Sequence, residues 1–317
     1  MKEIFNLYKE CRLCPRACGV DRTITPGACG ESAQLSIETA VLHGGEEPCI
    51  SGEKGSGTIF FNGCGLRCIF CQNMEISQKK ILKAKYYTED ELVEIMQKLA
   101  DLGATNINFV TPDHYLPHIV YAVKKFRAAG YTLPIVYNCS GWETIEHLKL
   151  ATEVVDVFLI DCKFSLPDVA RFCLRGKNET YPQVVWNALE FLYKQVGNLQ
   201  LDENGIAKSG VLVRHLVLPG MVENSLDIIN ELFFRFGADI YLSLMAQYTP
   251  SFLDLPENCG NENWRESLKR CLTESEYGKV VDLASDLGFE NLYLQELPES
   301  DDRYIPDFAS HKMFGKW

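Results

Sequence analysis

The sequence has few basic residues relative to acidic ones. Its 317 residues include 31 Lys and Arg against 43 Asp and Glu, a formal net charge of −12 at pH 7. Proteins that bind nucleic acids over a broad surface need an excess of basic side chains to neutralise phosphates. The charge balance argues against that class, and we expect no nucleic acid among the partners.

Long apolar runs are missing as well. The chain holds no stretch of about 18 apolar residues, the length that marks a membrane-spanning helix. The first residues, MKEIFNLYKECRLC, mix charged and apolar side chains and lack the apolar core of a signal peptide. No internal repeat or low-complexity segment is visible. We therefore expect a cytoplasmic protein without a membrane partner.

Cysteine, in contrast, is abundant. The chain has 13 cysteines, and eight of them lie within the first 71 residues. In a reducing compartment, clustered cysteines indicate metal binding or redox chemistry more than disulfides. The others are scattered, and each is most simply a small buried apolar residue: Cys139, Cys162, Cys173, Cys259 and Cys271.

The chain divides into three parts by composition. Residues 1–57 are rich in Cys, Gly and Pro and have little helical period, which indicates a small metal-binding appendage. Strand-like and helix-like segments alternate over residues 58–296, and residues 297–317 form a C-terminal tail. A helix at 88–103 is well marked, because Thr88 and Glu91 form a capping box and Gly103 ends the pattern.

Alternating strands and helices predict a parallel sheet. Six or seven such units are too few for a closed eight-fold barrel, so we expect an α/β fold of the partial (β/α)6-type TIM barrel. Chemistry in such folds lies at the carboxyl ends of the strands. Those ends are distinctly polar here and carry Thr111, Asn138, Ser140, Asp161, Lys163, Arg214, His215 and Gln247.

Three cysteines follow the first strand of this pattern. In FFNGCGLRCIFCQN, residues 60–73, Cys64, Cys68 and Cys71 have the spacing C-x3-C-x2-C. These offsets also fit one face of a helix, but Gly63 and Gly65 argue against a helix and suit a loop that wraps closely around a ligand.

A structural zinc site needs four ligands. No further Cys or His follows Cys71 closely, so zinc would require a distant histidine. A cubane iron–sulfur cluster held by three thiolates instead leaves one iron open to a substrate or cofactor. The missing fourth ligand then becomes the functional feature.

Several segments resemble a known family. FFNGCGLRCIFCQN closely resembles the cluster motif of the radical S-adenosylmethionine (SAM) enzymes. Together with CRLCPRACGVDR, INFVTPDHY and VRHLVLPG, it is similar to the pyruvate formate-lyase activating enzymes, specifically the PflX-like branch, over almost the whole chain. The resemblance implies a radical SAM core in which Cys64, Cys68 and Cys71 hold a 4Fe–4S cluster and SAM chelates the fourth iron.

The same resemblance implies a reaction. An external reductant of the flavodoxin or ferredoxin type would supply one electron, and SAM would be cleaved to methionine and a 5′-deoxyadenosyl radical. That radical would abstract hydrogen from a protein or small molecule, and a glycyl radical enzyme is one implied partner. The alternative is a zinc or iron–sulfur binding or electron-transfer protein without SAM chemistry.

The resemblance also assigns residues to SAM. Phe70 would lie against the adenine, and the intact D-x-K pair of Asp161 and Lys163 would contact the ribose or the polar end of SAM. Asn138 stands where the family has Asp, which puts a cation site there in doubt and leaves Asn138 and Ser140 as hydrogen-bonding candidates. Other strand-end residues would meet SAM or the substrate: Thr111, Arg214, His215 and Gln247.

Four N-terminal cysteines form a second candidate site. Cys11, Cys14, Cys18 and Cys29 follow the spacing C-x2-C-x3-C-x10-C, with Pro15 and Gly19 suited to tight turns. Zinc and a second iron–sulfur cluster both fit four thiolates, and unliganded thiols are the remaining alternative. Spare ligands could come from Cys49 or His43.

Overall fold

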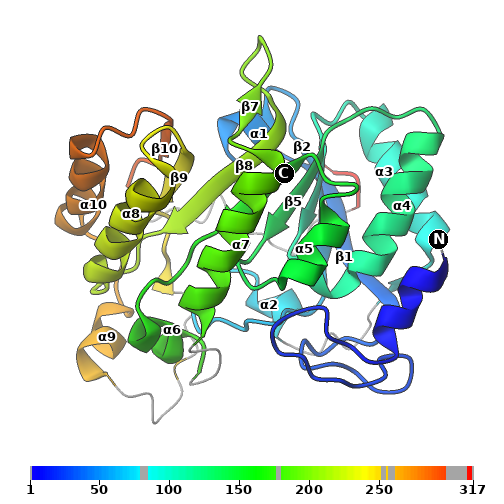
Figure 1. The fold of residues 1–317 in the computed structure, drawn as a ribbon, viewed down its shortest axis with the longest axis horizontal. Coiled ribbons are helices and arrows are strands. Elements are labelled where there is room, and N and C mark those ends of the chain that lie inside the picture. The colour runs from blue at the N-terminus through cyan, green and yellow to red at the C-terminus, as the bar shows by residue number, and fades with distance from the viewer. Residues whose placement is uncertain are drawn as a thin grey trace.

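A computed structural model describes residues 2–78, 85–175, 180–250, 255, 261–297 and 313–315. These residues build one ten-stranded sheet with the order β10-β9-β8-β6-β5-β4-β2-β1-β3, while β7 pairs with β8 (Figure 1). The strands are β1 (Leu35–His43), β2 (Ser56–Phe61), β3 (Tyr86–Tyr87), β4 (Ile107–Val110), β5 (Ile135–Cys139), β6 (Val157–Asp161), β7 (Gln200–Leu201), β8 (Ala207–Leu216), β9 (Tyr241–Met245) and β10 (Leu292–Leu294).

The sheet is mostly parallel and open. From β2 to β10 along the main path each neighbouring pair is parallel, and the two ends of the path, β10 and β3, are not paired with each other. The predicted α/β class with a partial barrel is thereby confirmed. Most of the predicted tail at 297–317 lies outside the described residues.

Helices connect the parallel strands. The capping box predicted at Thr88 and Glu91 is present and starts α3 (Glu89–Asp101). The others are α1 (Pro48–Ser51), α2 (Met74–Ser77), α4 (Leu116–Ala128), α5 (Ile145–Ala151), α6 (Pro167–Cys173), α7 (Tyr181–Val196), α8 (Val222–Phe236), α9 (Glu262–Ser267) and α10 (Glu274–Asp286), with 3-10 turns η1 (Lys2–Tyr8) and η2 (Asp113–Tyr115). Among the described residues, no helix combines the length and apolar character needed to cross a membrane.

One strand differs from the sequence-based division of the chain. Residues 35–43 were expected within the N-terminal appendage, but β1 pairs antiparallel with β2 along most of its length and also with β3. The sheet therefore extends across residue 57, and the domain boundary placed there remains a prediction. The loops before β1 lie at the same end of the molecule as α2, as the dark-blue trace in Figure 1 shows.

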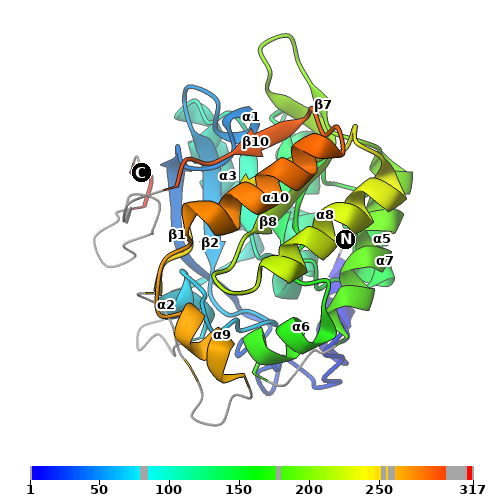
Figure 2. The same ribbon diagram turned by 90° about the vertical axis from the view of Figure 1, so that its left-hand side faces the viewer.

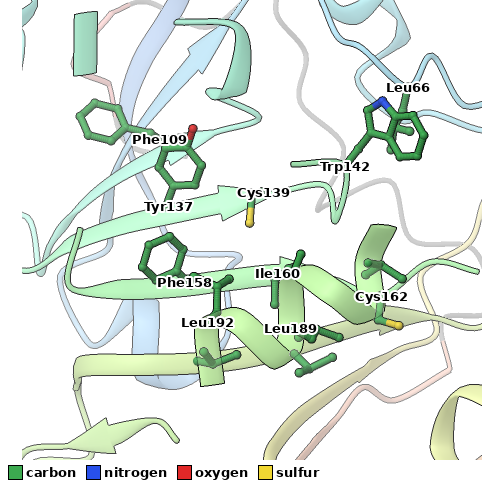
Figure 3. Packing of buried hydrophobic residues seen from close by; sticks show 14 of the residues in the cluster. Leu66, Phe109, Tyr137, Cys139, Trp142, Phe158, Ile160, Cys162, Leu189 and Leu192 are labelled. Atoms are coloured by element: carbon green, nitrogen blue, oxygen red, sulfur yellow. The ribbon is translucent and has the colours of Figure 1, made fainter. Parts of the chain in front are cut away.

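Side chains on the strands alternate between two faces. On the outer face, Tyr137 of β5 and Phe158 of β6 lie with ring centroids 6.0 Å apart, and α7 covers this face with Leu189 and Leu192 (Figure 3). On the opposite face, which we call the inner face, Val136, Leu159 and Leu212 pack with the fully buried Ile50 of α1. Helix α1 thus packs against the inner face of the open barrel. Longer helices cover the outer face, as the side view in Figure 2 shows for α7, α8 and α10.

Candidate active site

A cavity of about 1140 Å³, open to solvent, lies where the parallel strands end on the inner face. The three cysteines of the triplet line it together with residues from most of the parallel strands. Its walls include Cys64, Cys68, Cys71, Phe70, Thr111, Asn138, Ser140, Asp161, Lys163, Arg214 and Gln247. All but one of the residues that the sequence assigned to the triplet, SAM or the substrate therefore meet in one place.

The exception is His215. Because neighbouring residues of a strand face opposite ways, Arg214 and His215 cannot both enter the cavity. His215 is 1% exposed, and its two ring nitrogens lie 2.7 Å from the Cys162 carbonyl oxygen and 2.8 Å from the Ser225 hydroxyl. His215 therefore connects β8 to Cys162 and Ser225 on the outer face. This position does not support the predicted contact with SAM or the substrate.

The cysteine triplet lies on a loop between β2 and α2. Residues 62–73 contain no helix, so the helical-stripe interpretation is wrong. Gly63 has φ of +83°, a left-handed conformation that favours glycine, and a Cβ there would collide with Glu31 and approach the Cys29 carbonyl oxygen to 3.0 Å. The loop therefore depends on Gly63 to pack against the N-terminal segment.

The thiols of the triplet already have polar neighbours. The Leu66 N–H donates to Cys64 Sγ at 3.4 Å, and the Ser77 hydroxyl lies 3.3 Å from Cys71 Sγ. Burial raises the pKa of Cys64 to about 11 and also raises the pKa values of Cys68 and Cys71. A metal that binds here must therefore displace the thiol protons.

The triplet brings three thiols to the wall of one cavity. A structural zinc site is held by four protein ligands. In a cubane each thiolate binds a different iron, so three sulfurs spread along the wall of one cavity are compatible with it.

Asp161 and Lys163 form an ion pair at the end of β6. Burial opposes the charge on Lys163, but the adjacent Asp161 carboxylate outweighs it and raises the pKa of the lysine. Both side chains keep about a fifth of their surface exposed toward the cavity. The pair can therefore present one cation and one anion to a polar ligand.

A second ionic group was not predicted from the sequence. Arg214 Nε and Nη2 donate to the two carboxylate oxygens of Glu47 at 2.8 and 2.7 Å, and Nη2 also donates to Glu46. Glu46 accepts further hydrogen bonds from Asn108 at 3.0 Å and Asn138 at 3.2 Å. The two glutamates come from the segment between β1 and α1, which the sequence analysis had placed in the appendage.

This ionic group is almost completely withdrawn from solvent. The side chains of Arg214, Glu46 and Glu47 are 12%, 8% and 5% exposed. Burial opposes ionisation of Glu47, but Arg214 overcomes it and lowers the pKa of the carboxyl group. Glu46 and Arg214 line the cavity, so a ligand would meet the arginine already paired with carboxylates rather than as a free cation.

Thr111 has an unusual backbone. Its φ is +48°, a left-handed value that is rare for β-branched residues, and its N–H donates to the Asn138 carbonyl oxygen at 2.8 Å. Strain of this kind persists only where neighbouring contacts enforce it, and it is common at functional sites. The turn directs residue 111 to the cavity wall beside Val110.

Two further cavity residues have neighbours that fix them. The Phe70 ring meets Phe164 and Tyr248 edge-on, each with centroids 6.2 Å apart. The carbonyl oxygen of Gln247 accepts a hydrogen bond from Gln72 at 2.8 Å. Phe70 is therefore both a core aromatic and part of the cavity surface.

A buried carboxyl pair lies behind Ser140. Burial raises the pKa of Asp113 to about 7. Burial, together with the charge of the adjacent Asp113, raises the pKa of Glu143 well above its usual range. At neutral pH, one carboxyl group of the pair therefore stays protonated. Glu143 accepts from the Ser140 N–H at 3.1 Å, which fixes the end of β5.

The four N-terminal cysteines line a separate, smaller cavity next to the triplet loop. The two spare ligands proposed from the sequence lie elsewhere. Cys49 belongs to α1 and packs inside the barrel, and His43 lines the larger cavity. Neither lines the cavity of the N-terminal cysteines.

The comparisons with known proteins agree with this site. The sequence pattern of the radical SAM superfamily matches residues 58–232, more than half of the chain. An uncharacterized protein of Methanocaldococcus jannaschii is 30% identical over 299 residues, covering 91% of this chain and 78% of that protein. The chain therefore belongs to the radical SAM superfamily, which implies a 4Fe–4S cluster, SAM and reductive cleavage of SAM.

Other similarities are weaker. A provisionally named glycyl-radical enzyme activating enzyme of Haemophilus influenzae is 24% identical over 131 residues, 41% of this chain and 49% of that protein. Methylornithine synthase has a TM-score of 0.42 at 14% identity and covers 79% of this chain and 74% of its own. HydG, a maturase of the FeFe hydrogenase, has a TM-score of 0.49 at 13% identity, with 80% and 54% covered. The two solved structures are too distant to bear on the reaction.

The Arg214 group yields a stability prediction. Changing Arg214→Met leaves Glu46 and Glu47 buried without a cation, so we expect the free energy of unfolding to fall by about 3–5 kcal/mol. Adding Glu46→Gln and Glu47→Gln to that variant is expected to recover part of the loss, because no uncompensated charge remains.

The measurement is chemical denaturation of the metal-free chain. The matched control is Arg12→Met, which removes an ion pair with Glu10 whose side chains are 68% and 65% exposed and which we expect to cost under about 1 kcal/mol. Equal losses in Arg214→Met and Arg12→Met would contradict the prediction.

Proposed function

We propose that this chain is a radical SAM oxidoreductase that abstracts hydrogen from a protein or small-molecule substrate. The observation that carries the proposal is that Cys64, Cys68 and Cys71 line the same cavity as the polar ends of the parallel strands. A cluster held at the cysteines would thus share one cavity with the groups that could orient SAM and a substrate.

The residues present fit the cofactors that the family implies. Cys64, Cys68 and Cys71 would hold the cluster through thiolates, with the Leu66 N–H and the Ser77 hydroxyl stabilising the sulfur charge. When bound, the cluster and SAM supply the electron and the radical chemistry. The protein itself then binds and orients the cluster and SAM, and it shields the radical from solvent.

Each polar group has a matching part of SAM. The Asp161 carboxylate can accept hydrogen bonds from ribose hydroxyls, while Lys163 can pair with the carboxylate of the methionine moiety. The Phe70 ring offers an apolar surface for the adenine. Hydrogen bonds from Asn138, Ser140 and Thr111 would complete the contacts at the ends of β4 and β5.

A narrower candidate is activation of a glycyl radical enzyme. It is favoured by the partial similarity to the Haemophilus influenzae protein and by the motifs shared with the pyruvate formate-lyase activating enzymes, PflX-like branch. The cavity is open to solvent, so a peptide loop could enter it. Incubation with a purified glycyl radical enzyme, SAM and reductant should then produce a glycyl radical signal in electron paramagnetic resonance (EPR). Absence of that signal would contradict activation of this enzyme and favour another substrate.

Two further elements complete the proposal. A one-electron donor of the flavodoxin or ferredoxin type would reduce the cluster, which fits the cytoplasmic location that the sequence predicts. A second thiolate–metal site would be formed by Cys11, Cys14, Cys18 and Cys29, holding zinc or a second iron–sulfur cluster.

The decisive measurement is the release of 5′-deoxyadenosine from SAM after anaerobic reconstitution. The wild type should release it only in the presence of a reductant. The triple variant Cys64→Ala, Cys68→Ala, Cys71→Ala should lose at least about 100-fold in this activity, because the cluster has no ligands left.

Cys271→Ala is the matched control. Cys271 is exposed, contrary to the buried position expected from the sequence, and it lies outside both cysteine cavities. We expect it to release 5′-deoxyadenosine at the wild-type rate. Stoichiometric zinc in the wild type together with no SAM cleavage would instead establish the metal-binding alternative.

A further inference from the structure

The N-terminal cysteines surround a cavity of their own. Cys11, Cys14, Cys18 and Cys29 all line it, although the first and the last lie 18 positions apart in the sequence. Gly27 lies close to two of the sulfurs: a Cβ on Gly27 would lie 3.5 Å from Cys29 Sγ and 3.6 Å from Cys18 Sγ. The loop thus brings four thiols to one hollow rather than scattering them.

A buried arginine adjoins this cavity. Arg22 is 0% exposed and lines the hollow, with its Nη1 4.0 Å from Cys11 Sγ. Its guanidinium donates to the backbone carbonyl oxygens of Glu31 at 3.1 Å, Ser32 at 2.6 Å and His114, and its central carbon lies 4.7 Å from the Tyr8 ring centroid. All of these partners are uncharged.

Within the described part of the chain, no carboxylate lies at ion-pair distance from Arg22. The nearby Glu31 side chain instead accepts a hydrogen bond from the Tyr115 hydroxyl at 3.0 Å. A fully buried charge without a counter-charge costs several kcal/mol, so such charges are normally paired. Arg22 therefore indicates that the adjacent cavity carries negative charge.

Thiolates bound to metal supply that charge. A four-thiolate zinc site and a four-thiolate 4Fe–4S cluster are both net anions, because every ligand is deprotonated. The two differ in redox activity: zinc does not change its oxidation state, whereas a 4Fe–4S cluster can accept an electron and pass it on. The hollow of the four cysteines lies against the triplet loop, where a redox-active centre could exchange electrons with a cluster at the triplet.

We propose that Cys11, Cys14, Cys18 and Cys29 bind a second 4Fe–4S cluster whose charge is balanced by the buried Arg22. This inference chooses between the two metals that the proposed function left open. It also assigns Arg22 as a positioning residue that acts on the cluster through its charge.

The second site lies directly against the triplet loop. The Cys64 N–H donates to the Cys29 carbonyl oxygen at 3.3 Å, and a Cβ on Gly65 would lie 3.6 Å from Cys14 Sγ. Ser140 lines both cavities, and Trp142 closes the wall beside Gly65, where Figure 3 shows it near Leu66. The two groups of cysteines therefore come close together at the backbone of Cys64 and Gly65.

At this position the second cluster would relay electrons from the external donor to the cluster at the triplet. This role rests on the proposed function. Cys18 is exposed, so one edge of the site reaches the surface where a flavodoxin- or ferredoxin-type donor can approach. The donor would lose one electron to the second cluster, which would return to its starting state by passing that electron to the cluster at the triplet.

Metal analysis tests the site without disturbing its ligands. In the triple variant Cys64→Ala, Cys68→Ala, Cys71→Ala, we expect about four irons and four sulfides per chain to remain, against about eight of each in the wild type. Zinc without iron in this variant, or no metal at all, would overturn the inference and leave the proposed function untouched.

The charge of Arg22 can be tested in the same triple-alanine background. A nearby positive charge favours the more negative, reduced cluster, so Arg22→Met should lower its midpoint potential while Arg22→Lys largely preserves it. We expect a shift of at least tenfold in the reduction equilibrium, which is about 59 mV for one electron. The control is Arg12→Met, an exposed arginine next to Cys11.

Loss of iron in Arg22→Met that Arg22→Lys restores would support the same assignment. A potential and an iron content that stay unchanged in Arg22→Met would refute the role of Arg22.

The relay is tested by changing the electron donor. We expect the variant Cys11→Ser, Cys14→Ser, Cys18→Ser, Cys29→Ser to keep dithionite-driven release of 5′-deoxyadenosine but to lose more than about tenfold of the release driven by reduced flavodoxin. The dithionite reaction also shows that the variant is folded. If both rates fall equally, or if neither falls, the relay is wrong, whereas failure of the wild type with dithionite would refute the proposed function itself.

Discussion

The buried ionic group of Arg214, Glu46 and Glu47 is the constraint on which the rest of the site depends. It ties the segment before α1 to the inner face of β8, and through Glu46 it fixes Asn108 of β4 and Asn138 of β5. Because desolvation of three ions offsets much of their attraction, the group adds little net stability. Its effect is geometric: it holds α1 inside the open barrel and fixes the floor of the cavity.

The two-residue period of the strands explains why much of the cavity was predictable. Once the strands were placed, Asn138 and Ser140, and likewise Asp161 and Lys163, had to share a face at the same edge of the sheet. The same parity argument excludes His215 once Arg214 is known to point inward, and applying it to the sequence would have separated the two. Where a strand follows a regular two-residue period, the sequence alone therefore predicts which residues at its end share a face.

Glu46, Glu47 and Arg22 could not be found in this way, because their roles come from contacts far apart in the sequence. Glu47 meets Arg214 across 167 residues, and Arg22 donates to the His114 carbonyl oxygen across 92. The segments that carry them have no period, and β1 was not recognised as part of the sheet. Composition shows that residues 1–57 are rich in cysteine, but it does not indicate that Gly63 lets this part pack on the triplet loop.

The two groups of cysteines differ in how their surroundings handle charge. Beside the triplet, Lys163 is already paired with Asp161, so a ligand that binds there meets a balanced pair and is selected by hydrogen-bonding geometry. Beside the N-terminal cysteines, Arg22 has only neutral hydrogen-bond partners among the described residues, so an anion in the hollow would balance its charge. A site beside a buried, unpaired arginine is therefore suited to a permanently bound anionic metal centre. The cavity at the strand ends, where the lysine is already paired, is suited to a cofactor that binds and is consumed.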